Sequence, residues 1–169
     1  MNGDATPARP RPATIRRAEE RDYAAVRALY ARLQNTHASN QPQVFVPADE
    51  NELGRFDFHL AIEAADMIVL VAERDGDIVA AAQASLTCPS AEMRARRVVY
   101  VTHLFTEEQA RRQGHARALM RAIAAWARLK DATAIHLWVW EGNAEADGFY
   151  RALGCRAMAT LHACPLLGT

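Results

Sequence analysis

Residues 98–131 read VVYVTHLFTEEQARRQGHARALMRAIAAWARLKD, and this segment decides the fold. Its first nine residues, 98–106, are mostly β-branched or aromatic and predict a β-strand. An amphipathic helix is predicted to begin at Gly114, because Leu119, Ile123 and Trp126 recur at the spacing i, i+4 and i+7. A strand, a short acidic turn, a glycine loop and a helix therefore follow one another directly.

The loop ahead of this helix has the composition of a phosphate-binding site. Its sequence, RRQGHA over residues 111–116, places two arginines before the glycine that opens the helix. The first backbone N–H groups of a helix have no partner within it, and the helix dipole is positive at that end. The loop therefore predicts a phosphate site, although an arginine-rich turn ended by glycine would have the same residues.

Length and charge are those of one globular domain with no nucleic-acid or membrane partner. The chain has 169 residues, and its 20 Lys and Arg balance 20 Asp and Glu. It contains no apolar run of about 20 residues and no hydrophobic region typical of a signal peptide. An odd number of cysteines without a C-x-x-C pair is typical of a reduced, cytoplasmic protein; the three are Cys88, Cys155 and Cys164.

The remaining elements follow from hydrophobic spacing and turn residues. Residues 1–12 are expected to be a disordered tail, and residues 13–169 a single domain. Asp75 and Gly76 between two apolar runs predict a β-hairpin. Strands are expected at 13–18, 67–73, 78–86, 98–106 and 135–140, with one or two more in 156–166, and helices at 21–34, 49–64, from 114 onwards, and at 143–153.

This order of elements predicts an α/β fold. A hairpin meander followed by a β–α–β crossover gives a mixed, mostly antiparallel sheet of six to seven strands, flanked by about four helices. The helix at 49–64 is expected to bury Leu53, Phe56 and Leu60 on one face. Residues 35–47 form the longest predicted loop, and long loops in compact domains often carry function.

Two motifs on successive strand–helix units carry a resemblance to a known family. They are Arg111-x-x-Gly114-x-Ala116 and Asn143-x-x-Ala146-x-x-Phe149-Tyr150-x-x-Leu153-Gly154. With the hairpin and the strand before the loop, they make residues 13–166 resemble the GNAT superfamily of acetyl-CoA-dependent N-acetyltransferases. The resemblance implies a GNAT-like fold, acetyl-CoA as cosubstrate, no metal, and direct attack of a primary amine in a ternary complex. Members often dimerise, so a homodimer is an expectation of the resemblance.

The resemblance also implies a set of cofactor-binding residues. Loop backbone amides would bind the CoA pyrophosphate, and the strand before the loop would diverge from its neighbour at a bulge and line the pantetheine. One main-chain N–H of that strand would steady the developing oxyanion. The loop residues are Arg111, Arg112, Gln113, Gly114, His115 and Ala116, the strand residues are Leu104, Phe105 and Thr106, and Asn143 and Tyr150 would face the cofactor from the last helix.

An acid and a base are needed for amine acetylation. Tyr150 is the expected acid, because a phenol can donate a proton to the departing thiolate; the alternative is an aromatic residue packed in the core. Relatives often carry a carboxylate just before the leucine of the strand, where this chain has Thr102 and His103. His103 is the expected base, with Tyr100 and Glu141 as further candidates. The face of the sheet on which the His103 side chain lies is left open, because a bulge reverses strand alternation. The alternative role for His103 is that of a structural histidine.

Several residues leave function open. The missing carboxylate motivates an alternative, a catalytically silent CoA-binding or regulatory module. Cys155 stands where relatives have phenylalanine and is not expected to be a nucleophile, and His115 is expected to point to solvent more readily than to phosphate. Trp138 and Trp140, two apart, would share one strand face, in the core or along the acceptor site. Four acidic residues could attract a cationic acceptor, and the alternative is that they form a solvated helix face. They are Asp49, Glu50, Glu52 and Asp57.

Overall fold

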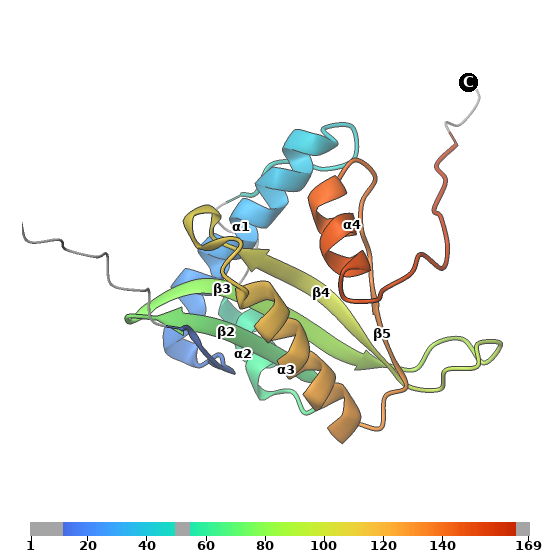
Figure 1. Cartoon of the computed structure of the whole chain (residues 1–169), viewed down its shortest axis with the longest axis horizontal. Helices are drawn as coiled ribbons and strands as arrows, with labels where there is room; N and C mark the ends of the chain where they lie inside the picture. Colours follow the sequence, from blue (N-terminus) through green and yellow to red (C-terminus); the bar gives the residue numbers. More distant parts are fainter. Residues whose placement is uncertain (1–11, 50–54, 165–169) are drawn as a thin grey trace, which may run out of the picture. The chain divides into compact units, whose positions relative to one another are not determined.

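Five strands form one sheet in the computed structural model, which describes residues 12–49 and 55–164 (Figure 1). The strands are β1 Thr14–Arg17, β2 Met67–Arg74, β3 Asp77–Thr87, β4 Val98–Thr106 and β5 Ala134–Leu137, in that spatial order. The first four pair antiparallel, and β5 pairs parallel to β4. The predicted α/β fold with a mixed, mostly antiparallel sheet is confirmed. The predicted strand count is wrong, because the described residues form five strands and not six to seven.

The missing strands were expected in the tail. Residues 156–164 are exposed and have no regular structure, so no buried face selects a strand register there. Residues 165 and 166 lie outside the described part of the chain. β5 is also shorter than predicted and ends at Leu137, so Trp138 and Trp140 do not share a strand face. Trp138 is 57% exposed and does not belong to the core.

The β2–β3 hairpin confirms the predicted turn. Asp75 and Gly76 both have positive φ, 52° and 93°, as a two-residue type I′ turn requires. The turn sets Arg74 opposite Asp77 and pairs the two strands along their length. β2 and β3 are buried through most of their residues, so they form the centre of the sheet.

Helices α1 (Tyr23–Asn40) and α2 (Arg55–Glu63) differ in length from the predictions. α1 continues six residues past the predicted end at residue 34, because no proline or glycine interrupts it before Pro42 and Ala38 adds a buried contact. Part of the expected 35–47 loop is therefore helical. Asp49 is not helical, residues 50–54, which include Leu53, lie outside the described residues, and Leu60 is 49% exposed and not in the core.

The two helical layers pack on opposite sides of the sheet. Val26, Leu29 and Tyr30 of α1 join Phe58 of α2 in a core cluster with side chains of β2 and β3, and Phe105 of β4 packs against it. Figure 1 shows α3, His115–Leu129, crossing the front of the sheet, while α2 lies behind the strands. Leu119, Ile123 and Trp126 are buried, as predicted from their spacing.

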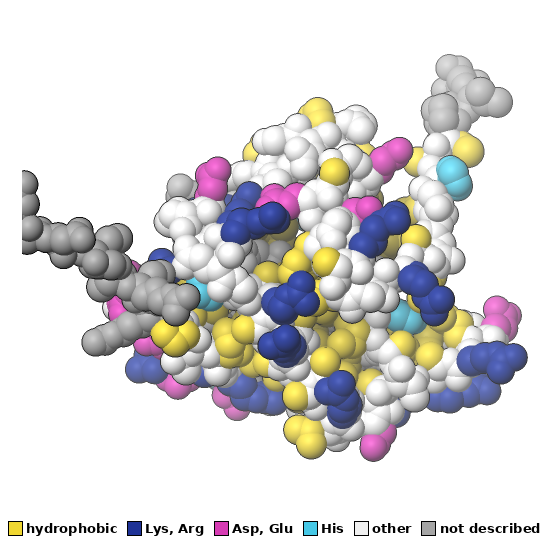
Figure 2. Space-filling view, in the orientation of Figure 1, with side chains coloured by type: hydrophobic (Ala, Val, Ile, Leu, Met, Phe, Trp, Pro, Cys, Tyr) yellow, Lys and Arg dark blue, Asp and Glu magenta, His cyan; other side chains and the backbone are white. Residues whose placement is uncertain are grey.

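The outer face of α3 is basic. Arg117, Arg121 and Arg128 are not buried, and Figure 2 shows a row of basic side chains over this helix. They take the face opposite the buried apolar residues, as an amphipathic helix requires. None of the described helices is long and apolar enough to cross a membrane.

A partly buried ion pair lies at the start of α1. Asp22 is 5% exposed and accepts hydrogen bonds from Arg16 Nη1 at 2.6 Å and from the Glu19 backbone N–H at 2.8 Å. The hydrogen bond from Arg16 is the main reason that the pKa of Asp22 lies below its ordinary value. Because Arg16 belongs to β1 and also pairs with Glu73 of β2, the network ties the start of α1 to the sheet.

The described residues divide into two compact units, one ending at Trp138 and the other beginning at Val139. The second unit contains α4, Ala144–Arg151. Asn143 is its N-cap, as predicted, and its side-chain oxygen accepts a hydrogen bond from the Ala146 N–H at 3.0 Å. Gly154, with φ of 88°, follows the end of the helix.

Candidate active site

A β-bulge in β4 decides which way its side chains face. Tyr100 pairs with Ser85, Val101 with Ala84 and His103 with Gln83, so Thr102 has no counterpart on β3. Directly opposite residues share a face of the sheet. The extra residue therefore puts Tyr100 and His103 on the same face, although an uninterrupted strand would place them on opposite faces. That face is the one covered by α1, whose Tyr30 contacts His103.

Beyond the bulge, β4 diverges from β5. The parallel pairing runs from Val98 with Ala134 to Val101 with Leu137 and ends there. β4 continues to Thr106 beside β3, and among the described strands no other pairs with this part of it. Backbone groups at such an edge need partners from outside the sheet. The bulge and the divergence expected before the glycine loop are therefore present.

The glycine loop has the backbone conformation of an anion site. Arg112 and Gly114 both have positive φ, 62° and 88°, and α3 begins at the next residue, His115. Left-handed residues alternating with others turn successive N–H groups toward one side, which makes a concavity suited to anions. A Cβ at Gly114 would meet no atom within 4 Å. The loop and the helix N-terminus therefore form a candidate anion site.

Side chains hold this loop in place. Gln113 accepts a hydrogen bond from Arg74 Nη1 at 2.5 Å and donates one to the Gln109 carbonyl at 3.0 Å. The Arg111 guanidinium lies over the Phe105 ring, 5.7 Å from its centroid, and its Nε donates to the Thr106 carbonyl at 3.4 Å. Arg111 therefore connects the loop to the end of β4, while the Arg112 side chain is exposed.

His115 does not point to solvent, contrary to the expectation. Its side chain is 6% exposed and its Nε2 has no hydrogen-bond partner among the described residues. Burial, and then the charge of Arg74, lowers the pKa of His115, so the imidazole is neutral at neutral pH. As the first residue of α3, His115 can contribute its backbone N–H to an anion.

His103 is stacked against α1. Its ring centroid lies 4.3 Å from that of Tyr30, with the planes inclined by 17°. Burial, and then the charge of His37, lowers the pKa of His103 from 6.5 to about 4. The imidazole is therefore uncharged at neutral pH and has an unoccupied lone pair on one nitrogen.

The Thr102 hydroxyl lies beside Nδ1 of His103. The Thr102 hydroxyl donates to the Gln83 carbonyl at 3.3 Å, and His103 Nδ1 lies 3.1 Å from the same hydroxyl oxygen. A hydroxyl has only one proton to donate. When the hydroxyl proton goes to the Gln83 carbonyl, Nδ1 of His103 is the protonated donor and the lone pair lies on Nε2. The threonine at the bulge thus orients the histidine beside it.

Two other residues near His103 were not identified from the sequence. The hydroxyl of Tyr30, a residue of the predicted helix at 21–34, is buried and has no hydrogen-bond partner among the described residues. His37 stacks on Phe45, with ring centroids 5.1 Å apart. Their separation of seven residues puts both on one face of α1, and that was the available signal.

Tyr100 is a further candidate for the base, and four acidic residues are the candidates for attracting a cationic acceptor. The Tyr100 hydroxyl is buried without a described partner, and burial raises the pKa of Tyr100, which disfavours the phenolate. Asp49 and Asp57 are exposed, while Glu50 and Glu52 lie outside the described residues. Within residues 12–49 and 55–164, no group of three or more His, Cys, Asp or Glu could hold a metal.

The remaining predicted residues belong to the second unit. Burial, and then the nearby Cys155, raises the pKa of Tyr150 to about 12. Phe149 meets the Tyr150 ring edge-on, with centroids 5.1 Å apart. The first unit therefore brings together His103, the end of β4 and the glycine loop, while Asn143, Tyr150 and the alternative base Glu141 lie on the second.

Comparisons with known proteins identify the family of the chain. The model of the acetyltransferase (GNAT) family matches residues 27–155. A single-residue mutant of the BH1408 protein from Bacillus halodurans is 29% identical, with a TM-score of 0.83 over 91% of this chain and 99% of that one. A search of curated protein sequences gave no match.

Two more distant structures share the fold. The aminoglycoside 6'-N-acetyltransferase AAC(6')-Ih from Acinetobacter baumannii is 18% identical, with a TM-score of 0.71 over 92% of this chain and 99% of that one. AAC(6')-Iy, in complex with the bisubstrate analog CoA-S-monomethyl-acetylneamine, is 20% identical, with a TM-score of 0.70 over 90% and 99%. Because the family match covers well over half of its length, the chain belongs to the acetyltransferase (GNAT) family.

Proposed function

We propose that the protein is an N-acetyltransferase that moves an acetyl group from acetyl-CoA to a primary amine by direct attack in a ternary complex. The observation that carries this proposal is the anion-binding conformation of the loop at Arg112 and Gly114, next to the edge of β4 that β5 leaves. The loop would suit a pyrophosphate, and the free edge of β4 would suit an extended chain of amides. Membership of the GNAT family supports the same conclusion.

The residues of the first unit would hold the cosubstrate. Backbone N–H groups from Arg111 to Ala116 bind the pyrophosphate, and the main chain from Leu104 to Thr106 pairs with the amides of the pantetheine. Acetyl-CoA, when bound, supplies a thioester carbonyl that an amine can attack. A main-chain N–H of β4 directed at that carbonyl oxygen would stabilise the negative charge that develops on it.

His103 would accept a proton from the attacking amine at Nε2. With a pKa of about 4, its imidazole cannot remove a proton from an ordinary ammonium group, so the amine must reach it neutral. Burial of the site favours the neutral form of an amine. The Nε2 lone pair of His103 accepts a hydrogen bond from the amine N–H and so orients the amine. His103 then takes that proton as the C–N bond forms.

Tyr150 would protonate the departing thiolate. Its pKa of about 12 keeps the phenol protonated across the physiological range, so the donor form is always present. A phenol of this pKa stabilises a thiolate mainly through a hydrogen bond, and the proton moves as the sulfur gains charge. Asn143 is the N-cap of α4, the helix that contains Tyr150.

One observation favours a second function, a catalytically silent CoA-binding module. β4 has no carboxylate ahead of Leu104, and His103 is a weak base. Calorimetric titration with acetyl-CoA, followed by acetyl-transfer assays on a broad amine panel, separates the two functions. Binding with turnover supports the enzyme, binding without turnover supports the silent module, and absence of binding contradicts both.

The catalytic assignment has its own test. His103→Ala and Tyr150→Phe should each lower kcat by about 10² when assayed beside the wild type under conditions where chemistry limits turnover. Full turnover by both variants would show that the acid and the base are other residues.

A further inference from the structure

Polar side chains interrupt the apolar centre of the sheet beside His103. β3 is buried from Val79 to Ala84 except at Gln83, which is half-buried, as is Ser85. This strand pairs with β2 on one side and β4 on the other, and polar groups in the middle of a sheet are costly to desolvate unless they find a partner. Within the described part of the chain, neither side chain forms a hydrogen bond. Both polar groups are therefore left for solvent or a ligand.

The strand register joins Gln83 to His103. The two residues lie directly opposite each other on β3 and β4, so their side chains share one face of the sheet, with Cβ atoms about 5 Å apart. On the same face, Ser85 lies opposite Tyr100, and Tyr100 lies opposite His136 of β5. All of these side chains are half-buried. They form a polar patch, which consists of Gln83, Ser85, Tyr100, His103 and His136.

Three groups of the polar patch can bind a ligand through hydrogen bonds. The Tyr100 hydroxyl is buried and is not one of them. The polar side-chain atoms of Gln83, Ser85 and His136 are not among the buried atoms that lack a partner in the described residues, and none of the three forms a hydrogen bond there. An amide, a hydroxyl and a neutral imidazole can each both donate and accept. These groups are therefore available next to the proposed base.

The chemistry of the polar patch favours a neutral ligand. It contains no Asp, Glu, Lys or Arg. An ammonium group would find no carboxylate in it and a carboxylate would find no cation, so either would lose hydration without a charged partner. A hydroxyl group can donate and accept, as the patch residues do. The patch extends about 7 Å along β3 and about 10 Å from β3 to β5, which suits one small ring with its substituents.

From this patch we infer that the acceptor is a primary amine with hydroxyl groups close to a single amino group, such as an amino sugar, and that the polar patch binds those hydroxyls. The inference rests on the proposed function and names its substrate class. With the amino group at Nε2 of His103, Gln83 would hold the nearest hydroxyl, because it lies directly opposite His103. Ser85 and His136 would bind hydroxyls farther from the amino group.

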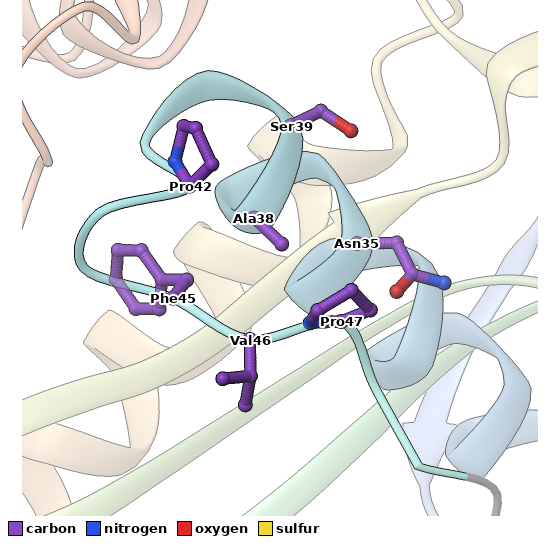
Figure 3. Close-up of a pocket in the computed structure, with 7 residues that line it drawn as sticks. All are labelled: Asn35, Ala38, Ser39, Pro42, Phe45, Val46 and Pro47. Carbon is purple, nitrogen blue, oxygen red and sulfur yellow. The ribbon is translucent and has the colours of Figure 1, made fainter.

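A cavity at the end of α1 is a separate place for a ligand. It has a volume of about 360 Å³ and lies between the helix and the loop that follows it (Figure 3). Among the described residues that line it, none belongs to the sheet; they are Asn35, Ala38, Ser39, Pro42, Phe45, Val46 and Pro47. Val46 is 67% exposed, so Val46→Ala is a control for a surface outside the polar patch.

Two amines with rings of equal size test the substrate class. D-Glucosamine carries hydroxyl groups and cyclohexylamine carries none. Because the two amines differ in pKa, each variant is compared with the wild type for each amine, so that this difference cancels. Turnover of cyclohexylamine or spermidine by the wild type without turnover of D-glucosamine overturns this inference and leaves the N-acetyltransferase intact. No transfer to any amine of a broad panel, in protein that binds acetyl-CoA, overturns the proposed function as well.

Gln83→Leu and Ser85→Ala test the polar patch. Each should lower kcat/KM for D-glucosamine about threefold to tenfold, while kcat/KM for cyclohexylamine and KM for acetyl-CoA stay almost unchanged. Each change removes a polar group without a partner, so the melting temperature should stay the same or rise. Ser85→Ala, the smaller change, carries the test by itself if Gln83→Leu does not fold.

The control decides between the two places for the acceptor. Val46→Ala should leave kcat/KM for both amines unchanged. A fall for D-glucosamine in Val46→Ala, without one in Gln83→Leu and Ser85→Ala, would place the acceptor in the cavity and overturn the inference. The same factor for both amines in the two patch variants would overturn it too, because the patch would then not distinguish a hydroxylated amine.

Discussion

The imidazole of His103 lies face to face with the phenol ring of Tyr30, at 4.3 Å between centroids. This contact depends on the bulge at Thr102, because without the extra residue His103 would face α3. The bulge therefore has two consequences: it turns the histidine toward α1, and it places a hydroxyl beside Nδ1 of the histidine. Both consequences lead to predictions.

Thr102→Val should remove the tautomer control. The variant loses the oxygen that accepts from Nδ1 of His103, so Nε2 becomes protonated in part of the population and kcat should fall by at least about tenfold. Thr102→Ser keeps the hydroxyl and is the matched control, with kcat expected within about twofold of the wild type. Because Thr102 is exposed, neither change should lower the melting temperature much. Equal activity of both variants would rule out a role for this hydroxyl.

His103 should make stability depend on pH. Its folded pKa of about 4 lies below the ordinary 6.5, so the unfolded chain binds the extra proton between these values. The stabilising contribution is full above pH 6.5 and is lost as pH falls toward 4, up to about 3 kcal/mol. In urea denaturation from pH 7 to pH 4.5, His103→Gln should lose less stability than the wild type. Parallel curves would mean that His103 titrates normally.

Gly114→Ala should weaken acetyl-CoA binding beyond its effect on stability. Gly114 and Gly76 have similar positive φ, 88° and 93°, and a Cβ at either would meet no atom within 4 Å. Alanine at either position should therefore cost about 1–2 kcal/mol of backbone strain. Only Gly114→Ala adds a methyl group where the phosphates would lie, so calorimetry should give at least about tenfold weaker acetyl-CoA binding for that variant alone. The same affinity in both variants would contradict a phosphate site in this loop.

The pH profile of kcat/KM should follow the amine substrate alone. With the pKa of His103 at about 4 and that of Tyr150 at about 12, both residues are in their active forms from about pH 5 to pH 11. The rate should therefore rise with the fraction of unprotonated amine and show no further break. Profiles recorded with two amines of different pKa check this, because the break should move with the amine. A fixed break near pH 6.5 would indicate a normally titrating histidine as the base.

Local signals in the sequence predicted much of the fold. The β4–α3 segment, the Asp75–Gly76 turn and the Asn143 cap were all found, because each depends on residues close together in the chain. The length of α1 and the number of strands were wrong. The length of α1 depends on tertiary contacts such as the burial of Ala38. The number of strands depends on the tail, which is exposed and lacks such contacts.

The interior of the site was harder to predict. Residue spacing could not give the facing of His103, since one extra residue reverses it. It also could not bring Tyr30 and His103 together, because nothing local connects α1 to β4. The burial of His115 was missed for a related reason, since a residue between a loop and a helix can face either way. The roles of the motif residues are still predictions, whereas the structure describes the backbone that carries them.

The most direct test of the N-acetyltransferase proposal is to measure both products of one reaction. Protein, acetyl-CoA and each primary amine of the panel are incubated together, and free CoA thiol and N-acetylated amine are quantified by absorbance and mass spectrometry. The account predicts equimolar thiol and acetylated amine for at least one amine, at a rate that falls in Tyr150→Phe and in His103→Ala. Acetylated amine no greater than in the reaction without protein, for every amine tested, would contradict it.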